Sequence, residues 1–168
     1  MGLAACSDSE FSEFPAGVIT RNDFENVQGW GGANESGVTS EKAHSGKYSV
    51  CVNPQIEFSY TYIRQLAQMS SGKPKRITVS AWAWVPDKDC KASLTLEIKH
   101  SPEKGTPVMY DGMELSSTVR SFKSWEKVSK TFVLPDSVAA TNQLKLYMWR
   151  GSSPRPVYLD DISIKVEN

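Results

Sequence analysis

The feature that most constrains the fold is an alternation of hydrophobic and polar residues with a period of two. Residues 77–85 alternate Ile, Val and Ala with Thr, Ser and Trp, and the same period runs through residues 94–99, 128–134, 144–149 and 157–166. Gly, Ser, Asp and Pro separate these segments, and no convincing helical period occurs. This pattern is typical of strands with one buried face joined by tight turns. We therefore expect an all-β protein, a two-sheet antiparallel β-sandwich of the jelly-roll type with roughly eight or nine strands.

Length and charge narrow the class further. The chain has 168 residues with 19 Lys and Arg against 19 Asp and Glu, enough to bury a core without help from metals or disulfides. A net charge of zero argues against nucleic acid or anionic lipid as a bulk partner, since both require clustered Lys and Arg. No stretch is apolar enough for a membrane-spanning helix. We expect residues 11–168 to form a single domain.

The first ten residues carry a separate signal. Leu3-Ala4-Ala5-Cys6 resembles the bacterial lipobox, and Asp8 and Glu10 resemble the acidic segment of surface lipoproteins of Bacteroidetes-type bacteria. The resemblance implies lipidation at Cys6, with residues 1–10 as a lipobox remnant and flexible tether. The protein would then be held at the bacterial outer membrane or cell surface by acyl chains alone. The basic and apolar parts of a signal peptide do not precede Leu3, which suggests an edited or truncated start; the alternative is a small N-terminus with an incidental cysteine.

Two further cysteines remain. Cys51 lies in an apolar strand pattern and Cys90 in a charged turn, so we expect two separate free thiols, although one disulfide is also compatible with the count.

Three segments carry a resemblance to a known family. They are Asn22-Asp23-Phe24-Glu25 followed by Gly29-Trp30, then residues 43–50, and finally residues 125–135 leading to residues 157–164. In this order they resemble jelly-roll carbohydrate-binding modules of the galactose-binding-like superfamily, the type found beside xylanases and glucanases. The resemblance implies non-catalytic binding of a polysaccharide or oligosaccharide, alongside other glycan-utilisation proteins as partners. The alternative is a structural or protein-interaction domain of a glycan-uptake or degradation system that binds no sugar itself.

The same resemblance implies a structural calcium (Ca²⁺). Its predicted ligands are Glu25, Ser45, Lys47 and Asp160, with Asp23 as a further candidate, the turn at residues 45–47 offering backbone carbonyls. Calcium prefers six to eight hard oxygen ligands, which distant carboxylates and carbonyls can supply. The strand pattern also places Asp160 on the face of Tyr158, Ile162 and Ile164, where a carboxylate must be paired or bound. The alternative is a salt bridge or a turn-capping Asp.

Outward-facing aromatic residues provide a candidate sugar surface. When the aliphatic residues of their strands fill the core, the rings of Trp82, Trp84, Tyr147 and Trp149 project the other way. Glu97 and Tyr62 lie on strands that could complete one ring-lined trough, and Tyr110 could sit on a loop at its edge. The alternative is that these large rings fill the core, as they often do in sandwiches.

An enzyme is not expected. His44 and His100 are the only histidines, and neither lies near a nucleophile motif. The pairing of Glu97 with Glu57 or Glu114 leaves glycoside hydrolysis open in principle, but a module of this size lacks the chain for a deep catalytic cleft.

Overall fold

The structure is a computed structural model that describes residues 15–26, 30, 37–100 and 105–168. Cys6 lies outside this range, so its predicted lipidation has no structural counterpart here. Within the described residues, ten strands form two antiparallel sheets. The first sheet contains β1 (Val18–Asn22), β2 (Val38–Thr39), β3 (Ser49–Val52), β5 (Arg76–Trp84), β8 (Trp125–Val133) and β10 (Val157–Glu167). The second contains β4 (Tyr62–Gln65), β6 (Ser93–Lys99), β7 (Met109–Glu114) and β9 (Gln143–Trp149).

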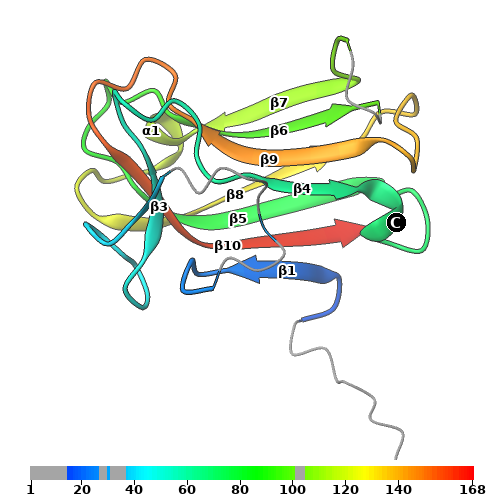
Figure 1. Cartoon of the computed structure of the whole chain (residues 1–168), viewed down its shortest axis with the longest axis horizontal. Helices are drawn as coiled ribbons and strands as arrows, with labels where there is room; N and C mark the ends of the chain where they lie inside the picture. The colour runs from blue at the N-terminus through cyan, green and yellow to red at the C-terminus, as the bar shows by residue number, and fades with distance from the viewer. Residues whose placement is uncertain (1–14, 27–29, 31–36, 101–104) are drawn as a thin grey trace, which may run out of the picture.

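The strand order confirms the predicted sandwich. The six-stranded sheet runs β2-β3-β10-β5-β8, with β1 also paired to β10, and the four-stranded sheet runs β4-β9-β6-β7. Figure 1 shows β7, β6, β9 and β4 in succession from the top, with β5, β10 and β1 below them. The first and last strands, β1 and β10, are neighbours. Two short helices, η1 (Leu66–Gln68) and α1 (Leu115–Thr118), connect strands.

The core lies between the two sheets and follows the predicted alternation. In β5, Ile77, Val79, Ala81 and Ala83 are fully buried while the intervening residues face outward. The same holds in β6 and β9, whose inward side chains are Leu94, Leu96, Ile98, Leu144, Leu146 and Met148. Because the aliphatic residues of these strands point inward, the residues between them lie on the outer faces of the sheets.

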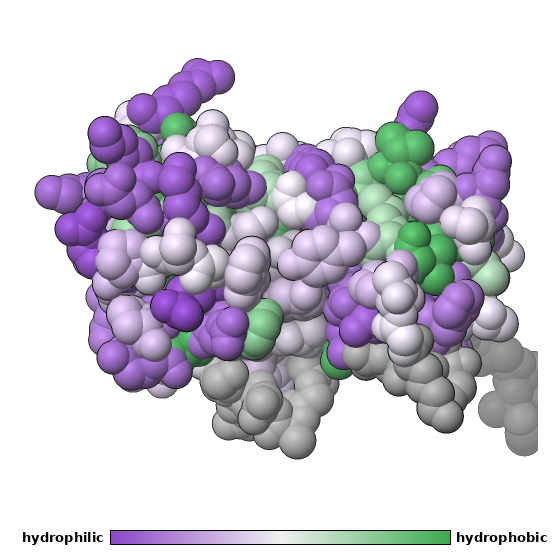
Figure 2. All heavy atoms as spheres, turned by 90° about the horizontal axis from the view of Figure 1, so that it is seen from above, coloured by the Kyte–Doolittle hydropathy of each residue, from purple (hydrophilic) through white to green (hydrophobic). Residues whose placement is uncertain are grey.

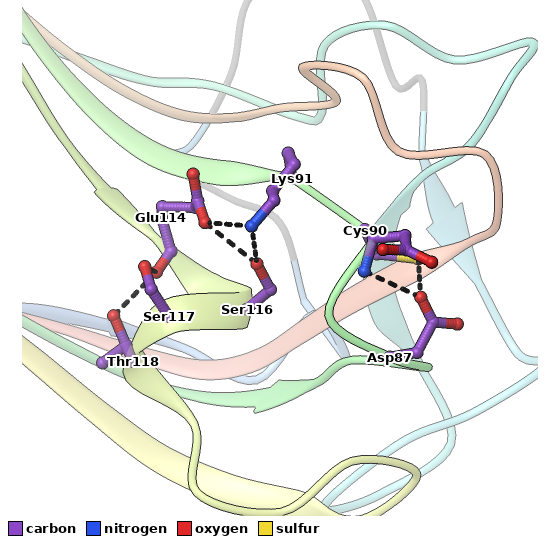
Figure 3. A network of polar contacts seen from close by, with 8 residues as sticks. Asp87, Cys90, Lys91, Glu114, Ser116, Ser117 and Thr118 are labelled. Carbon is purple, nitrogen blue, oxygen red and sulfur yellow. Dashed lines mark hydrogen bonds and ion pairs between the residues drawn. The ribbon is translucent and has the colours of Figure 1, made fainter.

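Polar contacts hold strand β7, at the edge of the four-stranded sheet, and the turn that precedes β6. Lys130 of β8 reaches β7 of the other sheet and donates to Asp111 at 2.7 Å. Near α1, Lys91 bonds Glu114 at 2.9 Å and approaches Ser116, while Cys90 contacts Asp87 in the preceding turn (Figure 3). The hydrogen bond from Lys91 holds the pKa of Glu114 below its ordinary value. These contacts fix the edge strand β7 against its neighbours.

Cys51 and Cys90 are buried free thiols, as predicted. No helix in the described part of the chain is long and apolar enough to cross a membrane. On the side seen in Figure 2, hydrophobic residues lie in small patches toward one end, and the other end is hydrophilic.

A bulge in β10 changes the side on which Asp160 lies. The pairing of β10 with β5 shifts register between Asp160 and Ser163, and Asp161 has a φ of 49°. As a result Asp160 lies opposite Trp82 on the outer side of the sheet, whereas Ile162 and Ile164 point into the core. The prediction that Asp160 shares a face with both isoleucines is therefore wrong, because a bulge reverses the alternation along the strand.

Candidate functional site

The outer face of the four-stranded sheet gathers polar and aromatic side chains from neighbouring strands. Tyr147 of β9 lies opposite Thr95 of β6, and one step along the strands Glu97 lies between Lys145 of β9 and Tyr110 of β7. These residues point outward because the residues between them fill the core. Side chains from three strands thus meet on one surface.

This face is hollowed beside β9. The hollow has a volume of about 360 Å³, within the range of roughly 300–1,000 Å³ typical of small-molecule sites. Its lining combines rings, an aliphatic side chain and charges: Phe58, Thr61, Ile63, Glu97, Lys99, Lys145 and Tyr147. We call this set the Tyr147 surface.

The rings around the Tyr147 surface are unusually exposed. Phe58 is 48% exposed, Tyr110 56% and Trp149 37%. Phe58 meets Tyr147 edge-on, with ring centroids 5.7 Å apart, and it pairs through its backbone with Trp149. The Trp149 indole donates to Glu57 at 3.4 Å. Contacts among the rings hold them in place while leaving aromatic area open to solvent.

The polar groups of this surface are held in an ordered arrangement. Glu97 forms an ion pair with Lys99 at 2.9 Å, and only 9% of Glu97 is exposed. Such a carboxylate still offers acceptor positions beyond the one that Lys99 occupies. An aromatic ring beside a partly covered carboxylate and ammonium groups can hold a ligand that has both C–H faces and hydroxyl groups.

The structure does not bring all of the predicted ring residues together. Tyr147, Trp149 and Glu97 share the four-stranded sheet, whereas Trp82 and Trp84 lie on β5, on the outer side of the other sheet. The single trough expected from the sequence therefore does not form. The alternation correctly predicts that both tryptophans point outward, but it carries no information on which sheet each strand joins.

Trp84 is covered by Tyr158 and Lys42. It meets Tyr158 edge-on at 5.7 Å, and the ammonium group of Lys42 lies 4.4 Å from its ring centroid. Tyr158 in turn donates to Glu41 at 2.7 Å, and burial raises the pKa of its hydroxyl. The segment around residues 41–45 thus packs over this end of the six-stranded sheet, and Trp84 has a structural role.

Tyr62 is a core residue, which corrects its predicted role in ligand binding. It is 4% exposed and packs against Trp30 with centroids 5.0 Å apart, and burial raises its pKa. Its partner across β9 is the inward-facing Leu146. The neighbouring Thr61 and Ile63 line the Tyr147 surface instead. Side chains alternate along the strand, so the residues on either side of the inward-facing Tyr62 point outward.

Two predicted calcium ligands are bonded to backbone amides. The Asp160 carboxylate accepts the N–H groups of His44 at 2.7 Å, Ser45 at 3.1 Å and Asp161 at 2.7 Å. Glu25 Oε1 accepts those of Lys47 and Tyr48, both at 2.6 Å. Two carboxylates, Asp160 in β10 and Glu25 just after β1, therefore bind one turn, residues 44–48, through its N–H groups and not its carbonyls.

This arrangement leaves few carboxylate oxygens for a calcium ion. The backbone amides bond both oxygens of Asp160 and Oε1 of Glu25, and Asp23 accepts the N–H of Glu25 at 3.1 Å. In the described ranges no group of three or more His, Cys, Asp or Glu side chains is placed to hold a metal. Burial raises the pKa of Asp160, and the amide hydrogen bonds oppose that rise. Calcium stays a prediction of the resemblance.

Sequence reasoning missed several members of the Tyr147 surface. Phe58 and Lys145 were not proposed, and β7, which carries Tyr110, was expected to be a loop. Lys145 alternates with Leu144 and Leu146 and so shares the outward phase of Tyr147, a signal that the sequence does contain. Phe58 lies before β4 begins, in a segment without regular alternation, so the sequence does not predict which way its side chain points.

Comparison with solved structures places the fold among carbohydrate-binding modules. The CBM22-2 xylan-binding domain of Paenibacillus barcinonensis Xyn10C is 18% identical with a TM-score of 0.60, covering 88% of this chain and 99% of that one. The CBM22-1 domain of the same protein is 17% identical with a TM-score of 0.59, covering 89% and 94%. The C-terminal family 22 module of Clostridium thermocellum Xyn10B is 12% identical with a TM-score of 0.58, covering 90% and 94%.

The family assignment follows from a sequence match over most of the domain. A family model described as a carbohydrate binding domain (CBM_4_9) matches residues 16–155, and the chain belongs to this family. It is a binding domain and not a catalytic one, in agreement with the sequence analysis. No curated protein matches the chain significantly.

Proposed function

We propose that the domain binds a polysaccharide chain on the Tyr147 surface. The observation that carries this proposal is the clustering of exposed rings: Phe58, Tyr110 and Trp149 all lie on or beside the outer face of one sheet. Exposed rings gathered beside charged groups on one face are typical of a ligand-binding surface. A sugar satisfies both parts, because its C–H faces pack on rings and its hydroxyls bond to charged groups.

The roles of individual residues follow from their geometry. The ring of Tyr147, held edge-on by Phe58 at 5.7 Å, would pack against a sugar ring, since the electron-rich face of an aromatic ring attracts polarised C–H groups. Glu97 would accept hydroxyl protons, and Lys99 and Lys145 would donate to hydroxyl oxygens. The Phe58–Tyr147 contact and the Glu97–Lys99 ion pair already exist without ligand, so these side chains need little further ordering on binding.

Xylan is the polysaccharide to test first. The CBM22 domains with which this chain shares its fold are xylan-binding domains, which supports the choice without identifying the sugar. The side chains around the hollow form an open surface rather than a closed pocket, which suits an internal stretch of a long chain better than a chain end.

Calorimetric titration with xylohexaose tests the proposal. Tyr147→Ala should weaken binding ten- to a hundredfold, or about 1.5–3 kcal/mol, as expected for a ring at the centre of an interface. Phe122→Ala is the matched control, because Phe122 is also an exposed ring (39%) but lies outside the Tyr147 surface. It should leave the affinity unchanged, and thermal melts should show that both variants are folded.

Other outcomes separate the alternatives. Equal affinity of Tyr147→Ala and the wild type would remove the Tyr147 surface from the function. A folded wild-type protein that binds none of xylan, glucan and mannan would favour the accessory, protein-interaction role that the sequence left open.

We also propose that Cys6 anchors the domain at a cell surface. The support is the lipobox resemblance of residues 3–6. Labelling of the protein with a radioactive fatty acid in a bacterial host, lost in Cys6→Ser, tests this separately from sugar binding.

A further inference from the structure

A second hollow lies on the outer face of the six-stranded sheet, away from the Tyr147 surface. It has a volume of about 580 Å³, again within the usual range for small-molecule sites. Its floor is made by strands that are direct neighbours in the sheet: β1, β10, β5 and β8 (Figure 1). The side chains that matter here are Arg21, Asp23, Trp82, Lys127 and Asp161. We call this site the Trp82 hollow.

The ring of Trp82 is held in a fixed orientation. His44 stacks on it with centroids 3.8 Å apart and an interplanar angle of 12°. His44 Nδ1 lies 2.6 Å from Asp161, whose other oxygen accepts the Ser45 hydroxyl at 2.8 Å. His44 is not part of the lining, so the hollow meets the part of the indole that His44 leaves uncovered. A pre-oriented aromatic ring on an open sheet is what a sugar ring requires for stacking.

The charges of the lining select the kind of ligand. Arg21 and Lys127 carry positive charges and Asp23 and Asp161 negative ones, so the four formal charges cancel. An anion would be drawn to the cations but repelled by the carboxylates. A sugar hydroxyl both donates and accepts, so a neutral sugar can bond to both signs at once. The hydroxyls of Ser80 and Ser163, opposite each other on β5 and β10, add further donors and acceptors.

We propose that the Trp82 hollow is a second carbohydrate site, which takes a neutral sugar ring stacked on Trp82 and bonded to Lys127. It does not depend on the Tyr147 surface, since the two sites lie on different sheets and share no residue. With both sites active, one domain would hold two glycan segments, which raises avidity for a polysaccharide matrix over that of either site alone.

The test is a titration of the ¹⁵N-labelled protein with xylotriose, followed by NMR. The indole N–H signal of Trp82, assigned with Trp82→Phe, and the amide signals of Ser80, Ser163 and Lys127 should shift together. Lys127→Gln should weaken this site about threefold, the effect of losing one exposed charged contact. Lys88→Gln is the matched control, since Lys88 is exposed and lies outside the hollow, and it should change nothing.

The outcomes distinguish the two sites. Shifts in the Trp82 group that persist in Tyr147→Ala support the second site, whether or not the Tyr147 surface binds. Shifts confined to β4, β6 and β9 would overturn it and leave the first proposal intact. Shifts of the Trp82 group with inorganic phosphate but not xylotriose would make this an anion site and also overturn the proposal. Equal xylotriose affinity of Lys127→Gln and the wild type would remove Lys127 from the site.

Discussion

Replacing Asp160 should destabilise the fold through the turn at residues 44–48. Asp160 is fully buried and accepts three backbone N–H groups. Truncation to Ala leaves all three donors without their partner; we count the two of His44 and Ser45, which join the turn to β10, and leave out that of Asp161, which is the next residue in the chain. Each orphaned donor costs about 1–3 kcal/mol, and we take the low end because both hydrogen bonds are only partly buried. The expected loss for Asp160→Ala is therefore about 2 kcal/mol in the free energy of unfolding.

A graded pair of variants separates the hydrogen bonds from simple loss of packing. Asp160→Asn keeps one acceptor oxygen and should lose about 1 kcal/mol, half the effect of Ala. Urea denaturation followed by tryptophan fluorescence measures both changes, and the melting temperature of Asp160→Ala should fall by about 4–8 °C for a domain of this size. A loss below about 0.5 kcal/mol for Ala, the level of an ordinary surface change, would refute the anchoring role of Asp160.

Three further predictions concern other parts of the fold. Lys91 lowers the pKa of Glu114 from 4.5, so this contact adds stability above pH 4.5 that is lost as the pH falls through the lowered pKa. The difference in unfolding free energy between the wild type and Lys91→Met should therefore shrink as the pH is lowered. A difference that stays constant with pH would contradict this. Burial raises the pKa of Cys51 to about 11, so a thiol reagent at pH 8 should label Cys51 only after unfolding, and rapid labelling of the native protein would show the strand to be open. Because amide groups already bond Asp160 and Glu25, a chelator should leave the melting temperature unchanged; a drop reversed by added calcium would instead establish the metal site implied by the family resemblance.

The sandwich was predictable because its strands have one buried face. The alternation in residues 77–85 predicted β5 and the outward direction of Trp82 and Trp84, and residues 144–149 did the same for Tyr147. Such patterns report the direction of a side chain relative to its own strand. They do not report which strands are neighbours, so four rings that all face outward were assigned to one trough although they lie on two sheets.

Two local features account for the remaining errors. The bulge at Asp161 reverses the alternation of β10, and nothing in the run of residues 157–166 reveals the extra residue. Tyr62 and Ile63 are both plausible surface residues by composition, and only the pairing of Tyr62 with Leu146 decides that Tyr62 faces the core. Register between strands is a tertiary property, which the local pattern of a four-residue strand does not determine.

The turn at residues 44–48 illustrates how a resemblance can locate residues without fixing their chemistry. Glu25 and Asp160 do meet this turn, as the resemblance implied. The sequence could not show that the turn presents N–H groups to them, because that depends on backbone orientation.

The most direct measurement is the crystal structure of the domain with xylohexaose bound. We predict sugar rings on the outer face of the four-stranded sheet, with one ring against Tyr147 and a hydroxyl bonded to Glu97. Sugar bound elsewhere on the domain, with Tyr147 and Glu97 both left in contact with solvent, would contradict it.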